Sequence, residues 1–182
     1  MWYWISTCIL KTLGWKQVRP YNIHEIPKFI IIAAPHTSSW DFLLGLLIRS
    51  SNKLETKFLG KSSLFKPPLG YIFRSLGGYP VDRQKNNNLV QTVVDIFNKH
   101  DRFSIALSPE GTRKKVTSFK TGFYHIAKAA NIPIIMIKFD FGNKIIDFHP
   151  PIYTSDDQEE DIRNIENHFK GIVGKRPNKG FF

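Results

Sequence analysis

The sequence predicts an α/β fold: one domain with a mixed, mostly parallel sheet flanked by helices, and a short amphipathic helix at its N-terminus. Short apolar runs alternate along the chain with longer stretches whose apolar residues recur at helical spacing. The first run, residues 29–34 (FIIIAA), is apolar at every position, as expected of a strand buried on both faces. With 182 residues, 42% of them hydrophobic, the chain can bury a substantial core as a single domain.

Residues 1–15 predict a helix whose narrow polar strip is formed by Thr7, Lys11 and Gly14. Such a helix reaches only about 22 Å, less than the roughly 30 Å hydrocarbon core of a bilayer, so we expect no membrane span. Its aromatic start favours the membrane interface, and the alternative is a helix that covers the core of its own domain. The first ten residues carry no charged side chain, so they lack the basic start of a secretory signal peptide. We therefore divide the chain into an interfacial helix, residues 1–15, and a domain, residues 16–182.

The remaining elements follow in chain order. Residues 61–75 contain Pro67 and Pro68, which predict short helices or a loop. The aromatic stretch within them, residues 64–73, fits a tunnel wall or a membrane contact as well as plain core. Gly142-Asn143 lies between the last two apolar runs and predicts a hairpin. The predicted strands are residues 29–34, 56–59, 79–81, 103–107, 133–139 and 144–148, and the other predicted helices are residues 39–50, 86–98, 118–130 and 156–170.

The charge of the chain points to an anionic partner. Lys and Arg number 26 against 15 Asp and Glu, a formal net charge of +11. Residues 156–182 hold five basic and six acidic residues, so the positive charge belongs to the body of the domain. Nucleic acid, a membrane surface and phosphorylated ligands all fit this charge. The basic residues are dispersed, and no strand shows the aromatic and glycine pattern of RNA-binding domains, so we expect no nucleic-acid partner.

The single cysteine and the scattered histidines predict no metal site. Cys8 cannot form an internal disulfide, and we expect it to be apolar filling in the N-terminal helix. No histidines or cysteines show the spacing of zinc ligands. The histidines other than His36 have no evident partner and fit structural or solvated roles.

A histidine and an aspartate lie where the first buried strand gives way to a helix. In residues 36–41 (HTSSWD), Asp41 is five residues after His36. Two helical side chains at this spacing diverge by about 140°, so the pair can meet only if His36 lies in the loop and Asp41 in the first helical turn. Ser38 or Ser39 as N-cap would give that arrangement. The aspartate can then hold one imidazole nitrogen and leave the other as a general base, whereas the alternative is a pair that caps a helix.

Two further segments place polar residues after strands. Residues 108–113 (SPEGTR) follow the predicted strand 103–107, and ligands of open α/β sheets bind at the carboxyl ends of strands. Gly111 permits close approach of a ligand to the backbone, and Thr112 and Arg113 suit a phosphate. Residues 77–83 (GGYPVDR) place another arginine after another short strand.

Together these segments resemble the glycerolipid acyltransferases, the family that includes the 1-acylglycerol-3-phosphate acyltransferases. Their order and spacing agree with that family across roughly residues 28–140. The combination is far more specific than any single motif. The matching residues are His36, Ser38 and Asp41 in the first motif; Gly78, Pro80, Val81 and Arg83 in the second; Pro109–Arg113 in the third; Ile132-Pro133-Ile134 in the fourth; and Phe119, Lys120 and Gly122 between the last two.

The resemblance implies the fold of that family and a reaction without a cofactor. His36 would remove the proton from an acceptor hydroxyl, whose oxygen attacks an acyl thioester, while Asp41 orients His36. The donor would be acyl-CoA or acyl carrier protein. The acceptor would be a lysophospholipid, foremost 1-acylglycerol-3-phosphate, in phospholipid biosynthesis. The sequence does not predict an oligomeric state.

The resemblance also implies a phosphate-binding cluster. In the family, the Glu-Gly-Thr-Arg block and the arginine of the second motif bind the phosphate of the acceptor. The corresponding residues here are Glu110, Gly111, Thr112, Arg113 and Arg83. Because Glu110 is itself anionic, we expect it to hold Arg113 or a hydroxyl. Lys61 lies where relatives often carry a basic residue of this cluster, and the alternative is a solvated surface lysine.

Three loop residues depart from the common family pattern: Pro35, Thr37 and Trp40. These departures leave the chemistry intact and leave the acceptor open. The alternatives are a different lipid acceptor, an acceptor without phosphate, and an inactive lipid-binding relative. We expect a peripheral protein at the cytoplasmic face of an anionic membrane surface.

Overall fold

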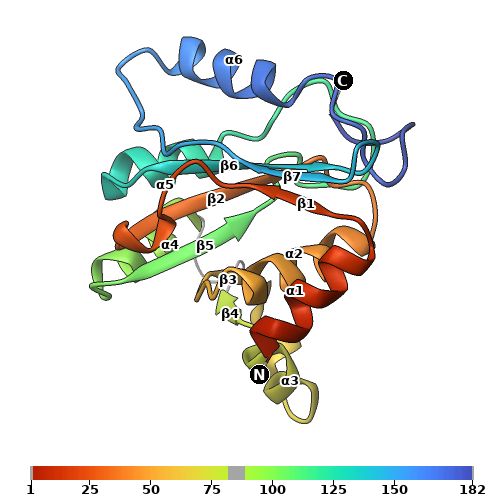
Figure 1. The fold of residues 1–182 in the computed structure, drawn as a ribbon. Helices are drawn as coiled ribbons and strands as arrows, with labels where there is room; N and C mark the ends of the chain where they lie inside the picture. The colour runs from red at the N-terminus through yellow and green to blue at the C-terminus, as the bar shows by residue number, and fades with distance from the viewer. Residues whose placement is uncertain (1, 82–88, 182) are drawn as a thin grey trace.

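The computed structural model describes residues 2–81 and 89–181, and they form a mixed, mostly parallel sheet flanked by helices (Figure 1). The strand order is β1-β7-β6-β2-β5-β3-β4. Adjacent strands are parallel except for β6 and β7, whose antiparallel pairing confirms the predicted hairpin. The predicted fold class is therefore confirmed. The strands are β1 (Lys16–Val18), β2 (Lys28–Ala34), β3 (Lys57–Lys61), β4 (Gly78–Val81), β5 (Phe103–Leu107), β6 (Ile134–Asp140) and β7 (Ile145–Phe148).

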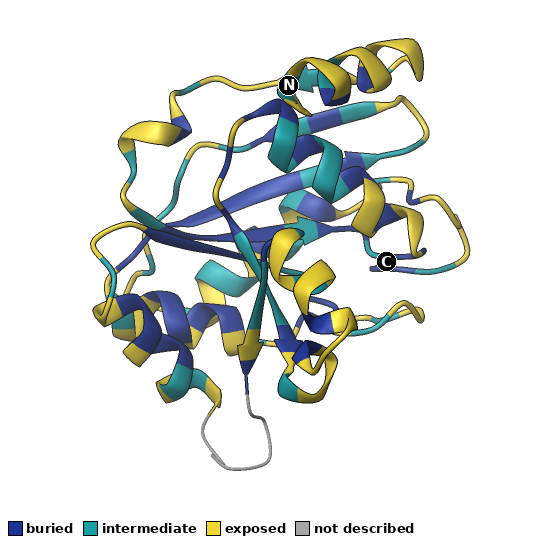
Figure 2. Ribbon diagram, turned by 90° about the horizontal axis from the view of Figure 1, so that it is seen from below, coloured by how far each residue is buried: buried dark blue, intermediate teal, exposed yellow. Residues whose placement is uncertain are grey.

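Helices cover both faces of the sheet. Helices α1 and α2 pack on one face, which we call the open face, and α4, α5 and α6 pack on the other, which we call the closed face. Figure 2 shows the strands as the buried centre, with exposed residues on the outer sides of the helices. The helices are α1 (Trp2–Thr12), α2 (Trp40–Ser51), α3 (Leu69–Ser75), α4 (Leu89–Asn98), α5 (Gly122–Ala130) and α6 (Gln158–Phe169), with the 3₁₀ turns η1 (Ile23–Glu25) and η2 (Ser62–Phe65).

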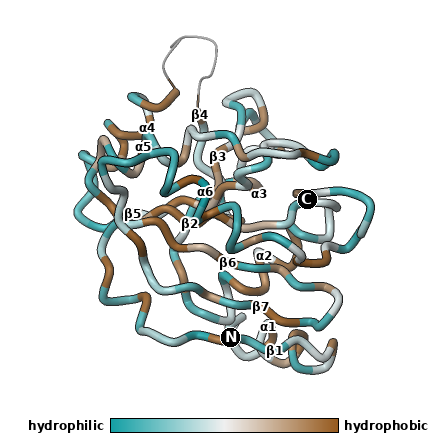
Figure 3. Tube along the Cα trace, turned by 90° about the horizontal axis from the view of Figure 1, so that it is seen from above, coloured by the Kyte–Doolittle hydropathy of each residue, from teal (hydrophilic) through white to brown (hydrophobic). Residues whose placement is uncertain are grey.

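The central strands are apolar on both sides because both faces are covered, as their uninterrupted apolar runs predict. In β2, Ile30 and Ile32 belong to the core of the closed face. Phe29 and Ile31, which alternate with them, belong to the core of the open face. The hydropathy colouring of Figure 3 shows the same concentration of hydrophobic residues along the central strands.

Several boundaries differ from the sequence-based ones. The edge strand β1 was not predicted, because three residues are too few to show a pattern. Helix α5 begins at Gly122 rather than at residue 118, because preceding backbone N–H groups serve tertiary contacts. The N–H of Phe119 donates to Glu166 Oε1 (2.7 Å), and the N–H of Lys120 donates to the Pro109 carbonyl (2.8 Å). The first residues of the predicted helix 86–98 lie outside the described residues.

Helix α1 has a buried side and an exposed side. Ser6 and Leu10 are buried, and Leu10 joins the core of the open face. Trp2 and Trp4 are 76% and 73% exposed. Cys8 is also exposed, so it does not fill the core as expected. No helix within the described residues has both the length and the apolar character needed to cross a bilayer.

Candidate active site

The predicted site residues follow strands that lie side by side. β2, β5, β3 and β4 are parallel neighbours, so their carboxyl ends share one edge of the sheet. His36 follows β2, the Glu110 loop follows β5, and Lys61 ends β3. Arg83, which follows β4, lies outside the described residues. One sheet edge therefore collects the described motif residues, as expected for a ligand site of an α/β fold.

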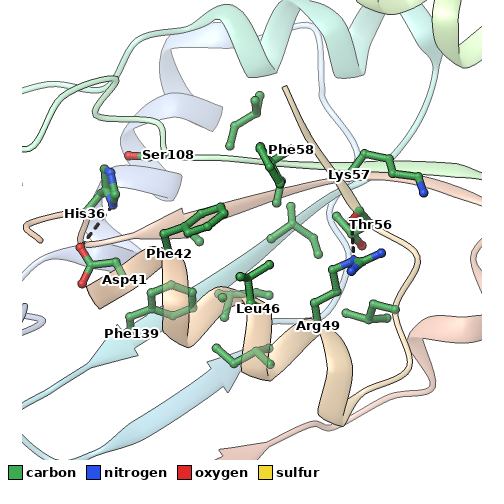
Figure 4. Close-up of a pocket in the computed structure, with 18 of the residues that line it drawn as sticks. His36, Asp41, Phe42, Leu46, Arg49, Thr56, Lys57, Phe58, Ser108 and Phe139 are labelled. Carbon is green, nitrogen blue, oxygen red and sulfur yellow. Dashed lines mark hydrogen bonds and ion pairs between the residues drawn. The ribbon is translucent and has the colours of Figure 1, made fainter. Parts of the chain in front are cut away.

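His36 and Asp41 are in contact, as their spacing predicts. His36 Nδ1 lies 3.2 Å from Asp41 Oδ2 (Figure 4). The aspartate side chain is 2% exposed and the imidazole 31%, so a buried carboxylate faces a ring that still reaches solvent. A carboxylate at Nδ1 favours the tautomer that carries its proton there. The outer nitrogen, Nε2, is then free to accept a proton.

The helix start that orients Asp41 differs in detail from the predicted cap. Ser39 occupies the N-cap position of α2 but makes no capping hydrogen bond through its side chain. Asp41 Oδ2 instead accepts the backbone N–H groups of Thr37 and Ser38, both at 2.7 Å. These bonds fold the loop back onto the first helical turn. The same carboxylate oxygen that contacts His36 therefore also fixes the loop that carries it.

Glu110 lies beneath His36 and does not contact Arg113. Its Oε2 accepts the backbone N–H of His36 at 2.7 Å and the hydroxyl of Ser108 at 3.0 Å. Of the two expected partners, the hydroxyl is the one observed. The residue is 1% exposed, and burial raises the pKa of its carboxyl group, while the bonds to Ser108 and His36 oppose that shift. Glu110 thus ties the loop after β5 to the loop after β2.

The other residues of the Glu-Gly-Thr-Arg block lie on the exposed side of the same loop. Arg113 Nη1 donates to Ser39 Oγ at 2.5 Å, which brings the guanidinium beside the His36 loop. Thr112 Oγ1 accepts the N–H of Lys114 (3.3 Å). Gly111 has φ +62°, a conformation that favours glycine, and a Cβ there would lie 2.8 Å from the Lys120 side chain. Lys61 is exposed at the end of β3, beside Val81 of β4.

An apolar cavity of about 230 Å³ opens at His36 and Asp41 and runs between α2 and the sheet (Figure 4). Phe42 and Phe58 form part of its wall, with their rings edge to face and 5.2 Å apart. Arg49 lines its far end, where Nε donates to the Thr56 carbonyl (2.9 Å) and burial lowers the pKa of the guanidinium. This cavity was not predicted from the sequence. Its one signal was Gly45 in an otherwise leucine-rich helix, because a Cβ at Gly45 meets nothing within 4 Å.

The C-terminal segment, residues 173–181, also packs against the site and was not predicted. The backbone N–H of Arg176 donates to Thr37 Oγ1 at 3.1 Å, next to His36. A Cβ at Gly174 would lie 2.6 Å from Thr37 Cγ2, and one at Gly180 would lie 3.0 Å from it. Both glycines are therefore required by close approach to the buried Thr37. Within the described residues, no group of His, Cys, Asp and Glu is arranged to hold a metal ion.

The comparisons with known proteins agree with this geometry. The family model described as Acyltransferase matches residues 17–139, which include the loops that carry His36 and Glu110. The chain belongs to the acyltransferase family. A 1-acyl-sn-glycerol-3-phosphate acyltransferase of Escherichia coli K12 is 28% identical over 166 residues, covering 80% of this chain and 66% of that protein. One of Saccharomyces cerevisiae is 30% identical over 131 residues, covering 67% of this chain and 41% of that protein.

A solved structure shares the acyltransferase fold. The crystal structure of the 1-acyl-sn-glycerophosphate acyltransferase PlsC from Thermotoga maritima matches with a TM-score of 0.62 and 21% sequence identity. The match covers 93% of this chain and 75% of that one. The family model ends at residue 139, so the C-terminal segment that contacts Thr37 lies beyond it.

Proposed function

We propose that the protein transfers a fatty acyl group from a thioester donor to a hydroxyl of a lysophospholipid, with 1-acylglycerol-3-phosphate as the foremost acceptor. The observation that carries this proposal is the His36–Asp41 pair at the mouth of an apolar cavity. Membership of the acyltransferase family and the names of the relatives support the same reaction in phospholipid biosynthesis. The chain spans 66% of the length of the E. coli relative.

His36 is the general base in this proposal. Its Nε2 takes the proton of the acceptor hydroxyl as the oxygen attacks the thioester carbonyl carbon, and a tetrahedral intermediate forms. The carbon–sulfur bond then breaks, and the leaving thiolate receives the proton from the imidazolium. Asp41 keeps Nδ1 protonated and stabilises the imidazolium while it exists. The reaction needs no covalent acyl-enzyme and no cofactor.

Glu110 is a positioning residue in this scheme. Its buried carboxylate accepts the backbone N–H of His36, so it positions the loop that carries His36. The phosphate of the acceptor is then bound by cationic groups and not by Glu110. Arg113 is the described residue best suited to that phosphate, because its guanidinium is exposed and lies against Ser39. Thr112, Gly111, Lys61 and Arg83 complete the proposed phosphate cluster.

The apolar cavity provides a site for the acyl chain. It starts at the His36–Asp41 pair, and the half-buried Arg49 at its far end places a charged group that an acyl chain cannot pass favourably. The distance from His36 to Arg49 therefore limits the length of an acyl chain that the cavity can hold. Either donor, acyl-CoA or acyl carrier protein, can deliver such a chain.

The open face is the proposed membrane-binding side, at the cytoplasmic face of the bilayer. A groove of about 1030 Å³ lies between α1 and α2, and its walls include the exposed Trp2 and Trp40. Lys53, Lys144 and Lys175 also line it, and no acidic side chain occurs among the described residues that do so. Apolar and aromatic groups with cations around them fit an anionic lipid surface. The protein is then peripheral, held by one side of α1.

An acyl-transfer assay of the full chain tests this function. With anionic vesicles, 1-acylglycerol-3-phosphate and both thioester donors, we expect acyl transfer that His36→Ala lowers by about a thousandfold. His24→Ala is the matched control, because His24 is exposed on η1 and we expect it to leave the rate unchanged. If the wild-type protein and His36→Ala both bind lipid and neither transfers an acyl group, the protein is instead an inactive lipid-binding relative.

Arg113→Ala tests the acceptor. We expect the KM for 1-acylglycerol-3-phosphate to rise by about tenfold while the KM for the thioester stays constant, because an arginine contact to phosphate is lost. An unchanged acceptor KM would show that the acceptor carries no phosphate at this site, and the panel would then extend to other lipid alcohols.

A further inference from the structure

The C-terminal segment that packs on the site forms a strap across three loops of the sheet edge. We define the strap as residues 173–181. The Val173 carbonyl accepts the N–H of Phe141 after β6 (2.8 Å), and the Gly180 carbonyl accepts the N–H of Val116 after β5 (2.9 Å). Between these anchors, Arg176 binds Thr37 after β2. In Figure 1 the strap is the dark-blue loop beside the orange loop that leads into α2.

Tight packing fixes both ends of the strap and leaves its middle in solvent. Gly174 and Gly180 are buried, and Phe181 is 5% exposed with its ring 4.4 Å from that of Phe119. The residues between the two glycines, 175–179 (KRPNK), are exposed or half-buried. The strap therefore presents a short cationic stretch at a fixed position next to the loop of His36.

The two segments that meet here carry charge of one sign, although Glu166 accepts the N–H of Phe119 and Glu110 lies against Gly180. Residues 111–121 contain four Lys and Arg and no Asp or Glu, and residues 170–181 contain four more, again with no acid. The bond between Val116 and Gly180 brings these two segments side by side. A local run of cations from two adjacent segments attracts a polyanion more strongly than the dispersed charge of the remaining surface.

We infer that the strap binds the phosphate groups of the acyl donor, a thioester of coenzyme A, through Arg176 and Lys179. This inference rests on the proposed acyl transfer and adds the site and the class of its donor. The acceptor-phosphate cluster follows β5, β3 and β4, whereas the strap reaches from the β6 loop across the β2 loop. The strap also joins the loop after β5 through Val116, so the two sets of cations lie on adjacent loops, with Arg113 assigned to the acceptor and Arg176 and Lys179 to the donor.

The size of the cationic stretch favours coenzyme A over a carrier protein. Coenzyme A carries a diphosphate and a 3′-phosphate close together, which suits an arginine fork and a neighbouring lysine. A specific protein partner covers about 800 Å² on each side, far more than five residues held between two buried glycines. Acyl carrier protein is therefore the rival source of the acyl group, and the experiment separates the two.

The test compares Arg176→Gln/Lys179→Gln with a control of equal charge change, Lys99→Gln/Lys128→Gln, in the full chain. Lys99 and Lys128 are exposed near the amino ends of β5 and β6, at the opposite edge of the sheet. The backbone bond of Arg176 to Thr37 survives the substitution. Titration calorimetry with free coenzyme A measures the Kd, and steady-state kinetics measure the KM of each substrate.

We expect the strap variant to raise the Kd of coenzyme A and the KM of acyl-CoA by about fivefold, because two exposed charge pairs are lost. The kcat, the acceptor KM and the KM of an acyl-N-acetylcysteamine thioester, which has no phosphate, should not change. The control variant should match wild type in every measurement.

Three results would overturn the inference: an unchanged Kd for coenzyme A, a rise confined to the acceptor KM, or a rise confined to the KM of acyl carrier protein. The last would make the strap a docking site for that protein. The calorimetric arm needs no turnover, so strap-dependent binding of coenzyme A by a protein that transfers no acyl group would sink the proposed function and leave the binding site standing.

Discussion

The two faces of the sheet are built from the same strands but differ in how completely they are filled. On the closed face, twenty buried described residues, among them Phe97 and Phe123, form one continuous core under α4, α5 and α6. On the open face the core contains twelve, and both the cavity beside His36 and the groove between α1 and α2 lie there. Leu43 and Trp40 of α2 are also exposed on this side. The closed face is thus a continuous core, whereas the open face contains the cavity and the groove that we propose for the acyl chain and for lipid.

This difference follows from helix α2. Its Asp41 end follows the loop that carries His36, and its Leu46 and Arg49 line both the cavity and the groove. A side chain of α2 that borders the cavity or the groove has no neighbour on that side, and close packing is what gives a buried side chain its stabilising contacts. Stability and function should therefore respond to mutation on different faces.

The largest expected effect is on the closed face. Phe97 is fully buried, with its ring 5.1 Å from that of Phe103 and edge to face. Phe97→Ala should lower the free energy of unfolding by about 3–5 kcal/mol, because it leaves a cavity in a packed core. Leu46→Ala, beside space that is already empty, should cost about 1 kcal/mol. Denaturant unfolding of both variants measures the difference, and equal losses would mean that the faces are equally packed.

Filling the cavity should separate function from stability on the open face. In Gly45→Leu the added side chain points into empty space, so unfolding should change by no more than about 1 kcal/mol, in the stabilising direction because leucine favours helix. The kcat/KM for long-chain donors should fall by about tenfold relative to short-chain donors, because the leucine occupies the chain's place.

Ala129→Leu on the exposed side of α5 is the matched control for that substitution and should leave chain-length preference unchanged. A Gly45→Leu enzyme with wild-type preference would show that the acyl chain lies elsewhere, for instance in the groove between α1 and α2.

The closed face could be predicted from the sequence almost entirely, and the open face only in part. Uninterrupted apolar runs and helical spacing are local patterns, and they predicted the shared strands β2, β5 and β6 and the closed-face helix α4. The contact of His36 with Asp41 followed from loop and helix geometry. The partner of Glu110 did not, because a carboxylate that binds a backbone N–H 74 residues away leaves no mark in local sequence.

The strap and the cavity likewise could not be predicted from local sequence. Gly174 and Gly180 are required by contact with Thr37, a residue far away in the chain, and Gly45 opens a space that only the packed helix defines. Tertiary contacts of this kind decide the site. The motifs could name its residues but could not say which of them face substrate and which support the loop.

Membrane binding should depend on the exposed aromatics of the open face. Trp2→Ala/Trp4→Ala should weaken binding to vesicles of phosphatidylglycerol by about tenfold in a sedimentation assay, because two interfacial side chains are lost, with little change in unfolding. Tyr153→Ala, which removes a 66% exposed aromatic next to α6, should bind as wild type does. Unchanged binding of the tryptophan variant would support the alternative in which α1 only covers the core.

The smallest expected effect is a pH dependence that originates on the closed face. Burial, with smaller contributions from Lys138 and His149, lowers the pKa of His168 to about 4, whereas an unfolded histidine titrates near 6.5. Above pH 6.5 the residue is neutral in both states and contributes nothing. As the pH falls from 6.5 toward 4, the unfolded chain gains a proton that the folded protein does not, so the free energy of unfolding falls.

His168→Gln should remove that part of the pH dependence. His168 Nε2 makes no hydrogen bond to the described residues, and the ring packs edge to face on His149, 4.5 Å away. Between pH 7 and 4.5 we expect wild type to lose about 1 kcal/mol more than the variant, a value reduced for partial solvent screening of the ring. His24→Gln, an exposed histidine of the open face, should lose as much as wild type. Parallel pH curves for wild type and His168→Gln would mean that His168 takes up a proton in the folded protein as readily as in the unfolded chain. The packing around His168 on the closed face would then be loose enough to let solvent in.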